Sequence, residues 1–177
     1  NSVLSGDELI LKNVSSVTFY GSTLNYNKYY QLGNSFISQG SLLNIVDFQF
    51  DEIIKPKTIQ SDRFVFEYNM SYLRTVLENN KMKRLVLNLD PNNTENKKVS
   101  FDASANPSSF KLNLNEFKVN NTQNLMLNNF DINLNQSDLN LDNIKNITLS
   151  KKAKLAVPKI VLKNGSIINN IGQFGSD

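Results

Sequence analysis

The sequence of 177 residues contains no cysteine and no histidine. Without cysteine, the chain has no disulfide, no thiol nucleophile and no thiolate metal ligand. Without histidine, the Ser-His, Cys-His and His-metal arrangements of many enzymes are excluded. Arginine is scarce as well, because only Arg63, Arg74 and Arg84 occur beside the lysines. These absences predict a protein that is not an enzyme and that holds no metal and no cofactor.

The sequence also lacks a long apolar run. No stretch approaches the roughly 20 apolar residues that a membrane-spanning helix requires. The net charge of +3 is too small to keep the chain unfolded by repulsion. The sequence begins at Asn1 without methionine, which suggests a processed form. Together with the asparagine-rich, cysteine-free composition, this favours an extracellular or cell-surface location in a bacterium.

What the sequence has in abundance is apolar residues at a spacing of two. In RFVFEYNMSY (63–72), Phe64, Phe66 and Tyr68 begin a strict alternation that is typical of a strand. MKRLVLNLD (82–90) alternates in the same way after the turn-like ENNK (78–81). The two stretches predict a long antiparallel hairpin. A helix over 69–80 is the competing interpretation.

The second half repeats a pattern of leucine and asparagine. KLNLNEFKV, NLMLNNFDI, DLNLDNIKN and KLAVPKIVL follow one motif, L-x-L-x-x-Φ-x-Φ, where Φ is apolar; the third lacks the last Φ. The motif recurs at a nearly constant spacing, with its first leucine at Leu112, Leu125, Leu139 and Leu155. A composition that was merely rich in leucine and asparagine would not keep this phase.

The phase of the motif predicts a corner. In one straight strand, the first two apolar positions would face one way and the last two would face the other. Both pairs point inward only if the chain turns between them, as in a β-solenoid or a bulged strand of an antiparallel meander. For a solenoid, two repeats per coil, roughly 27 to 30 residues, are expected. The asparagines suit such turns and can also stack in hydrogen-bonded ladders.

These patterns predict an all-β fold with two lobes. Residues 1–104 are expected to form an antiparallel sheet with hairpins, and residues 105–177 a β-solenoid-like or meander repeat region. The Ser/Asn/Pro-rich stretch SFDASANPSSF (100–110) suits a connection between them. The two lobes could share one core.

Two parts of the sequence resemble known families. Residues 17–50 contain an aromatic strand, the tyrosine-rich YYQLGNSFIS and then GSLLNIVDFQF, and they resemble the globular part of minor pilins and pseudopilins. The family's N-terminal hydrophobic helix and C-terminal disulfide are absent from this sequence. Residues 110–171 resemble the β-solenoids of bacterial adhesins and autotransporter passengers. The resemblances imply filament or surface proteins as partners, with a glycan or host surface as a further candidate.

Candidate binding residues fall into two groups. Tyr26, Tyr29 and Tyr30 could form an aromatic platform, although core packing and edge-strand burial are the favoured interpretation. Lys81, Lys83 and Arg84 belong to a lysine-rich set that could attract anionic polymers; because the overall charge is mild, nucleic acid is not expected as a partner. Lysines that guard strand edges are the alternative.

Acidic residues suggest two further roles. Calcium binding by Asp131, Asp138 and Asp142 is disfavoured because the glycines and fixed spacing of calcium repeats are missing. The carboxylate pairs Asp47/Asp51 and Glu52/Glu67 could in principle hydrolyse glycosides.

The favoured function is therefore a non-catalytic structural or adhesive protein of the bacterial surface, in the form of a minor-pilin-like filament or secretion component. The alternatives are a stand-alone adhesin or autotransporter-passenger-type solenoid, a polysaccharide-active enzyme on a β-helix, and an envelope lipid carrier.

Overall fold

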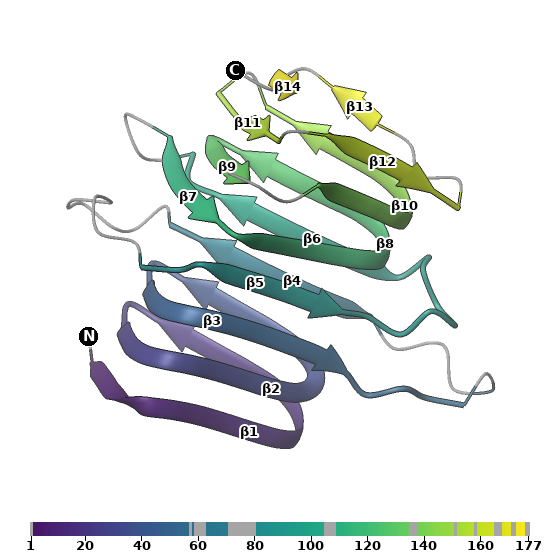
Figure 1. Cartoon of the computed structure of the whole chain (residues 1–177). Helices are drawn as coiled ribbons and strands as arrows, with labels where there is room; N and C mark the ends of the chain where they lie inside the picture. Colours follow the sequence, from purple (N-terminus) through teal and green to yellow (C-terminus); the bar gives the residue numbers. More distant parts are fainter. Residues whose placement is uncertain are drawn as a thin grey trace.

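The computed structural model is a β-solenoid of about six turns, with no helix in the part of the chain that it describes (Figure 1). That part comprises residues 2–56, 58, 63–70, 81–104, 109–134, 138–150, 152–157, 159–164, 168–170 and 173–175. The strands are β1 (Val3–Tyr20), β2 (Thr23–Gln39), β3 (Leu42–Glu52), β4 (Phe64–Asn69), β5 (Arg84–Asn88), β6 (Lys97–Asp102), β7 (Phe110–Leu114), β8 (Glu116–Asn128), β9 (Phe130–Leu134), β10 (Leu139–Leu149), β11 (Lys154–Ala156), β12 (Ile160–Lys163), β13 (Ile168–Asn170) and β14 (Gln173–Gly175).

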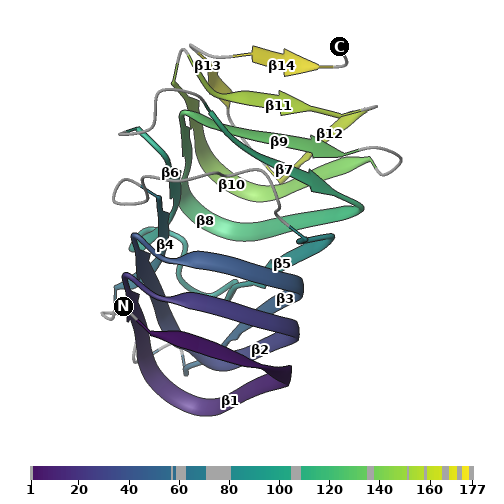
Figure 2. The ribbon, with the colours of Figure 1, turned by 90° about the vertical axis from the view of Figure 1, so that its left-hand side faces the viewer.

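The coils are stacked so that each strand pairs in parallel with strands of neighbouring coils. The long strands bend, so that β8 and β10 each contribute to two sides of the coil and β1 and β2 each contribute to three (Figure 2). We call two of these sides the first and second faces. The first face contains 8–12, 28–32, 47–51, β5, 116–119, 139–142 and β12, and the second contains 14–20, 33–39, β4, β6, 122–128, 144–149 and β13. The third face is formed by residues 3–6, 23–26 and 42–45 in the N-terminal coils and by the sheet β14-β11-β9-β7 in the C-terminal half.

Asparagines with left-handed backbone mark the corners between faces. Among the described residues, five asparagines have φ between 52° and 57°: Asn13, Asn121, Asn129, Asn143 and Asn164. Asparagine tolerates this region better than other side chains apart from glycine, and Gly21 and Gly40 have similar φ values. The side chains also bond from coil to coil, because Asn143 Nδ2 donates to Asn121 Oδ1 at 3.0 Å. Both roles expected for the asparagines are confirmed.

The corners explain the repeat motif. In NLMLNNFDI the corner residue Asn129 lies between Leu127 and Phe130, and in DLNLDNIKN Asn143 lies between Leu141 and Ile144. All four flanking apolar side chains are buried. The prediction that the chain turns within L-x-L-x-x-Φ so that both halves point inward is therefore confirmed.

The expected coil length is wrong. Val3 pairs with Thr23 and Asp131 with Lys154, so a coil without a long insertion is shorter than two leucine repeats. Leu112 pairs with Ile132 of the next coil, and Ile132 pairs with Leu155 of the coil after that. The motifs that begin at Leu112 and Leu155 are three repeats apart but only two coils apart. Each repeat therefore advances by two faces of a three-sided coil.

Aromatic side chains form a stack along the inside of the N-terminal coils. Phe36 lies between Phe19 and Phe66, with ring centroids 6.0 and 5.1 Å away. Tyr29 stacks on Phe48 with centroids 4.6 Å apart and planes 9° apart. Such pairs contribute roughly 0.5–1.5 kcal/mol each beyond the burial of their surface. In the C-terminal coils most inward positions are occupied by leucine and isoleucine, beside the buried Phe110, Phe117 and Phe130.

The predicted antiparallel sheet in the first part of the chain is wrong, because all strand pairings among its described residues are parallel. The predicted hairpin is wrong for the same reason: β4 pairs with β2 and β6, whereas β5 pairs with β3 and β8. Alternation identified the strands but not their partners, since a solenoid strand pairs with the strand one coil away. The antiparallel meander is likewise wrong for the second part. Most of the proposed turn (78–81) and of the competing helix (69–80) lies outside the described residues.

The division at residue 104 stays a prediction. Apolar residues from both sides of this position belong to one buried cluster, in which Phe101 lies 5.3 Å from Phe130 between ring centroids. β6 also pairs with β8 across the same position.

We predict that replacing a corner asparagine with valine destabilises the fold. Asn143→Val forces a β-branched residue into the left-handed region, at a cost of about 1–2 kcal/mol, and removes a hydrogen bond to Asn121 worth about 1 kcal/mol. The free energy of unfolding in urea should fall by about 2–3 kcal/mol. Asn143→Gly, which keeps the backbone freedom, should lose only about 1 kcal/mol. Equal losses in both variants would contradict the role assigned to φ.

Candidate functional site

The outer surface of the first face has a row of alternating charges. The backbone register aligns one residue from each of five successive coils: Glu8, Lys28, Asp47, Arg84 and Glu116. Each charge in this row has a charge of opposite sign beside it on the adjacent coil, at strand spacing. The row therefore favours this coil register over a slipped one.

Arg84, one of the predicted binding residues, is the centre of this row. Its Nη1 donates to Asp47 Oδ1 at 2.8 Å and to Gln49 Oε1 at 3.1 Å, and its Nε donates to Glu116 Oε2 at 2.8 Å. Burial by itself lowers the pKa of Arg84, but the bonds to the two carboxylates raise it above its ordinary value. Arg84 thus joins three coils, and its charge is compensated by the protein itself.

The alternation stops at the next coil, and there the first face opens. β8 and β10 pair from Asn120 and Asp142 onward. The same register, continued back along both strands, aligns Glu116 with Asp138, so that two carboxylates follow each other without a cation between them. In the described part of the chain, the pairing of β8 with β10 does not extend to residues 116–119, which pair with β5 on their other side. Repulsion between the two carboxylates favours this separation.

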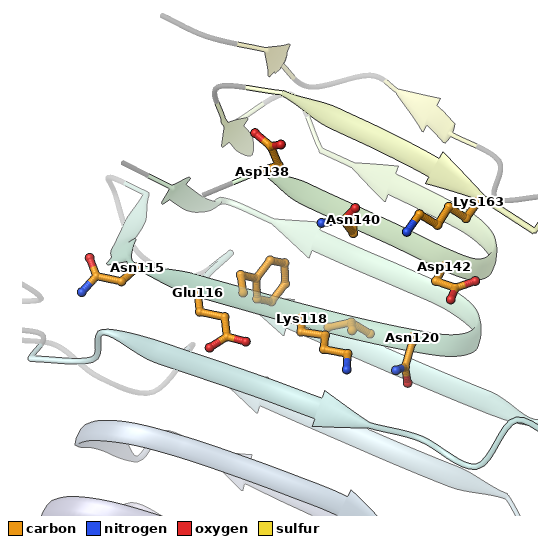
Figure 3. Close-up of a pocket in the computed structure, with 10 residues that line it drawn as sticks. Asn115, Glu116, Lys118, Asn120, Asp138, Asn140, Asp142 and Lys163 are labelled. Carbon is orange, nitrogen blue, oxygen red and sulfur yellow. The ribbon is translucent and has the colours of Figure 1, made fainter. Parts of the chain in front are cut away.

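The opening is a cleft of about 750 Å³ between β8 and β10 (Figure 3). Its lining consists of Asn115, Glu116, Phe117, Lys118, Val119, Asn120, Asp138, Asn140, Asp142 and Lys163. The two apolar members, Phe117 and Val119, are buried. Figure 3 shows Lys118 and Asn120 on β8 opposite Asn140 and Asp142 on β10. The lining combines three carboxylates, two ammonium groups and three amides, and thus offers both donors and acceptors, with one more negative than positive charge.

The end of the cleft at Asp142 is fixed by the corner of the next coil. Asp142 accepts a hydrogen bond from Asn164 Nδ2 at 2.5 Å. Asp142 also lies in register with Lys163 of β12. The carboxylate is therefore held by the next coil, so that this end of the cleft is preorganised.

The predicted tyrosine platform does not form. Tyr29 is fully buried, and its hydroxyl donates to Gln31 Oε1 at 2.6 Å, so that its assignment to the surface is wrong. Tyr30 points to the opposite side of β2 and donates to Asp51 Oδ2 at 2.8 Å. Tyr26 is partly buried against the core. Adjacent residues of a strand face opposite ways, which separates Tyr29 from Tyr30.

Lys81 and Lys83 are exposed, as the binding hypothesis requires. The backbone of Lys83 is tied to neighbouring coils, because its N–H donates to the carbonyl of Val46 at 2.8 Å and its carbonyl accepts from the N–H of Asn115 at 2.7 Å. With Arg84 neutralised by Asp47 and Glu116, the predicted set of three cations is reduced to two lysines.

A buried ion pair links the end of β3 to the start of β6. Lys97 Nζ, with its side chain 2% exposed, donates to Glu52 Oε2 and to the carbonyl of Asp90. The N–H of Asp90 also donates to Glu52 Oε2, at 2.6 Å. Burial raises the pKa of Glu52 and lowers that of Lys97, while their mutual hydrogen bond opposes both shifts. Glu52, weighed above as half of a hydrolytic pair, is therefore bound by the protein's own groups.

The aspartates considered for calcium do not come together. Asp131 lies on the third face between Lys111 and Lys154, while Asp138 and Asp142 line the cleft on the first face. No group of three or more potential metal-binding side chains occurs among the described residues. Within those residues there is also no helix long and apolar enough to cross a membrane.

Comparison with known proteins gives no relative. No family model, no curated protein and no solved structure matches this chain. The solenoid and its cleft therefore have to be interpreted from their own geometry.

The cleft was missed by sequence reasoning because it depends on the coil length. Glu116 and Asp138 are aligned only if one coil separates them, and a coil of two leucine repeats is too long for this. The signal in the sequence was the recurrence of charged residues one coil apart, as in Glu8 and Lys28. This recurrence of charges was overlooked because the leucine motif repeats at a shorter spacing than the coil.

We predict that alkaline pH destabilises the fold through buried tyrosines. Burial raises the pKa of Tyr29 and Tyr68 far above the ordinary value of about 10. Above pH 10 the unfolded chain releases protons that the folded chain retains, so the free energy of unfolding falls as pH rises. In an ultraviolet titration these two tyrosines should ionise only on unfolding. Tyr29→Phe/Tyr68→Phe should flatten the alkaline decrease, and ionisation of all six tyrosines near pH 10 in the folded protein would contradict the assignment.

Proposed function

We propose that this chain is a non-catalytic structural and adhesive module of the bacterial surface. In this proposal the solenoid is a rigid support, and the outer wall of its coils makes the contacts. The observation that carries the proposal is the cleft between β8 and β10, a preorganised polar surface built from two adjacent coils. Its balanced donors and acceptors suit a ligand that is rich in hydroxyl groups, because a hydroxyl both donates and accepts.

A neutral glycan fits this chemistry better than an anionic polymer does. The three carboxylates Glu116, Asp138 and Asp142 outnumber the two ammonium groups of Lys118 and Lys163, so that the lining repels phosphate and carboxylate groups on balance. The cleft volume of about 750 Å³ lies within the range of roughly 300–1,000 Å³ that is typical of small-ligand sites. The glycan is therefore our proposed partner class, and nucleic acid is not.

One observation favours the adhesin or passenger-type alternative over the filament component, and a second argues against the enzyme alternative. Residues 17–50, which resemble minor pilins, belong to β1, β2 and β3, and these strands pair in parallel as coils of the solenoid. The carboxylates Asp47 and Glu52 are bonded to Arg84 and Lys97, which argues against a hydrolytic role. The filament version rests on the sequence resemblance alone.

We predict that neutral oligosaccharides bind in the cleft. Titrations of the isotope-labelled chain with cellotetraose, tetra-N-acetylchitotetraose and tetragalacturonate, followed by NMR, should shift amide signals of residues 116–120 and 138–142 with one or both neutral sugars only. Lys118→Ala/Asn140→Ala removes two hydrogen-bonding groups, each worth about 0.5–1.5 kcal/mol, so affinity should fall about tenfold or more.

The matched control is Lys111→Ala/Asn113→Ala, which alters two exposed residues of the third face and should leave binding unchanged. Shifts with tetragalacturonate that disappear at high salt would instead support the basic-surface hypothesis around Lys81 and Lys83. A lack of shifts with every sugar would refute the proposed role of the cleft.

A further inference from the structure

The strand β1 is the edge of the large sheet at the N-terminal end of the solenoid (Figure 1). In the described part of the chain it pairs with β2 on one side only. Its inward residues Leu9 and Leu11 are only partly buried, whereas Tyr29, which pairs with Leu9, is completely buried. On its outer side Ile10 is 45% exposed. A long strand with an open edge and uncovered apolar side chains is a template for pairing with another strand.

The straight part of this edge is short and has a definite charge pattern. Residues 8–12 read Glu-Leu-Ile-Leu-Lys and lie on the first face. On one side the register with β2 omits Asp7, and on the other the chain bends at Asn13, where φ is 57°. Residues at equal distances on either side of Ile10 are alike in size and polarity, but the two end residues, Glu8 and Lys12, carry opposite charges. A segment of this kind is complementary to itself when it is reversed.

We propose that β1 pairs with β1 of a second copy of this chain, antiparallel, about a two-fold axis at Ile10. In this pairing Glu8 of each copy faces Lys12 of the other, and Ile10 faces Ile10. Leu9 faces Leu11 on the inner side, so the two cores meet across the new strand pair. A two-fold interface uses the same surface on both copies, which a self-complementary segment satisfies.

The backbone supports the same register. In a strand, alternate residues direct their N–H and C=O groups toward the same edge. Residues 8, 10 and 12 share one direction, so every facing pair in this register consists of residues with equivalent orientation. Two opposite-charge pairs and a central apolar pair each stabilise antiparallel strands by roughly 0.2–1 kcal/mol.

Parallel stacking on the C-terminal coil of another copy is the main competitor. Leu139 of β10 pairs with Ile160 of β12, and Asp142 pairs with Lys163. Continuing the rows of the first face in this register places Lys159 in the row of Glu8 and Lys163 in the row of Lys12. Glu8 would then face a lysine, but Lys12 would also face a lysine. One of the two charge contacts is therefore repulsive, whereas both are attractive in the two-fold pairing.

The two-fold pairing is independent of the proposed glycan binding, but it has a consequence for it. The cleft lies between β8 and β10, several coils from β1, so the dimer would carry one cleft on each side of its axis. Two linked sites bind a repetitive surface more tightly than one site does when both are engaged.

Charge exchange tests the pairing. Sedimentation equilibrium of the full chain over about 1 µM to 1 mM should give a monomer–dimer equilibrium. Glu8→Lys places lysine opposite Lys12, and Lys12→Glu places glutamate opposite Glu8, so each variant should weaken dimerisation about tenfold or more. The double variant Glu8→Lys/Lys12→Glu should restore it. An equimolar mixture of the two single variants should form a heterodimer, since all of its facing charges are opposite.

The control is Lys145→Glu, which changes an exposed residue of β10 far from β1 and should leave dimerisation unchanged. Circular dichroism would verify that each variant keeps its strand signal. Three results would overturn the proposal: a monomeric chain at all concentrations, a double variant as weak as the singles, or a Lys12→Glu variant that associates more tightly. The last result is the one that parallel head-to-tail stacking predicts.

Discussion

Each side chain of this solenoid lies beside the side chain at the equivalent position of the next coil, and the rest of the structure depends on this register. Parallel pairing holds adjacent coils at strand spacing. A residue therefore fits the fold only if its side chain can lie beside the side chains at the equivalent positions of the neighbouring coils. Inward positions satisfy this by stacking aromatic on aromatic, as Phe36 does with Phe66, and outward positions by alternating charge, as Arg84 does with Asp47 and Glu116. Corner positions satisfy it with asparagine, which accepts a left-handed backbone and bonds to the asparagine one coil away.

The same constraint explains why a break in the pattern matters. In the row of the first face, two like charges follow each other at Glu116 and Asp138. There β8 and β10 separate and leave a cleft. The buried pair Lys97 and Glu52, by contrast, keeps its charges compensated at a corner and leaves the coil closed. The polar cleft and the open edge of β1 are two places where the described wall of the solenoid has hydrogen-bonding groups or charges without a partner strand, and the interactions that we propose are assigned to them.

The sequence predicted the strands and the corners well, because both depend on local chemistry. Alternation identified β4 and β5, and the phase of the leucine motif located the turns at Asn129 and Asn143. Strand partners were not predictable in this way, because Phe64 alternates identically in a hairpin and in a solenoid, and so the parallel pairing of β4 with β2 and β6 was missed. The coil length was overestimated because the leucine motif advances by two faces of a three-sided coil, so that its spacing is not a simple fraction of one coil. The cleft was not predicted for the same reason, because it is formed by residues one coil apart. Tyr29, a candidate for the aromatic platform, packs on Phe48 inside, as the core-packing interpretation expects.

Engineered disulfides between coils test the central claim of parallel register most directly, in a chain that has no cysteine of its own. Asn124 pairs with Asn146 and Met126 with Thr148 on the outward side of β8 and β10. Cysteines at either of these pairs should cross-link readily in the folded protein, because aligned Cα atoms lie about 5 Å apart. Cysteines at 124 with 148, or at 126 with 146, would be aligned only in an antiparallel sheet. In the parallel register they lie about 8 Å apart, so they should stay reduced. Preferential cross-linking of these second pairs would contradict the solenoid.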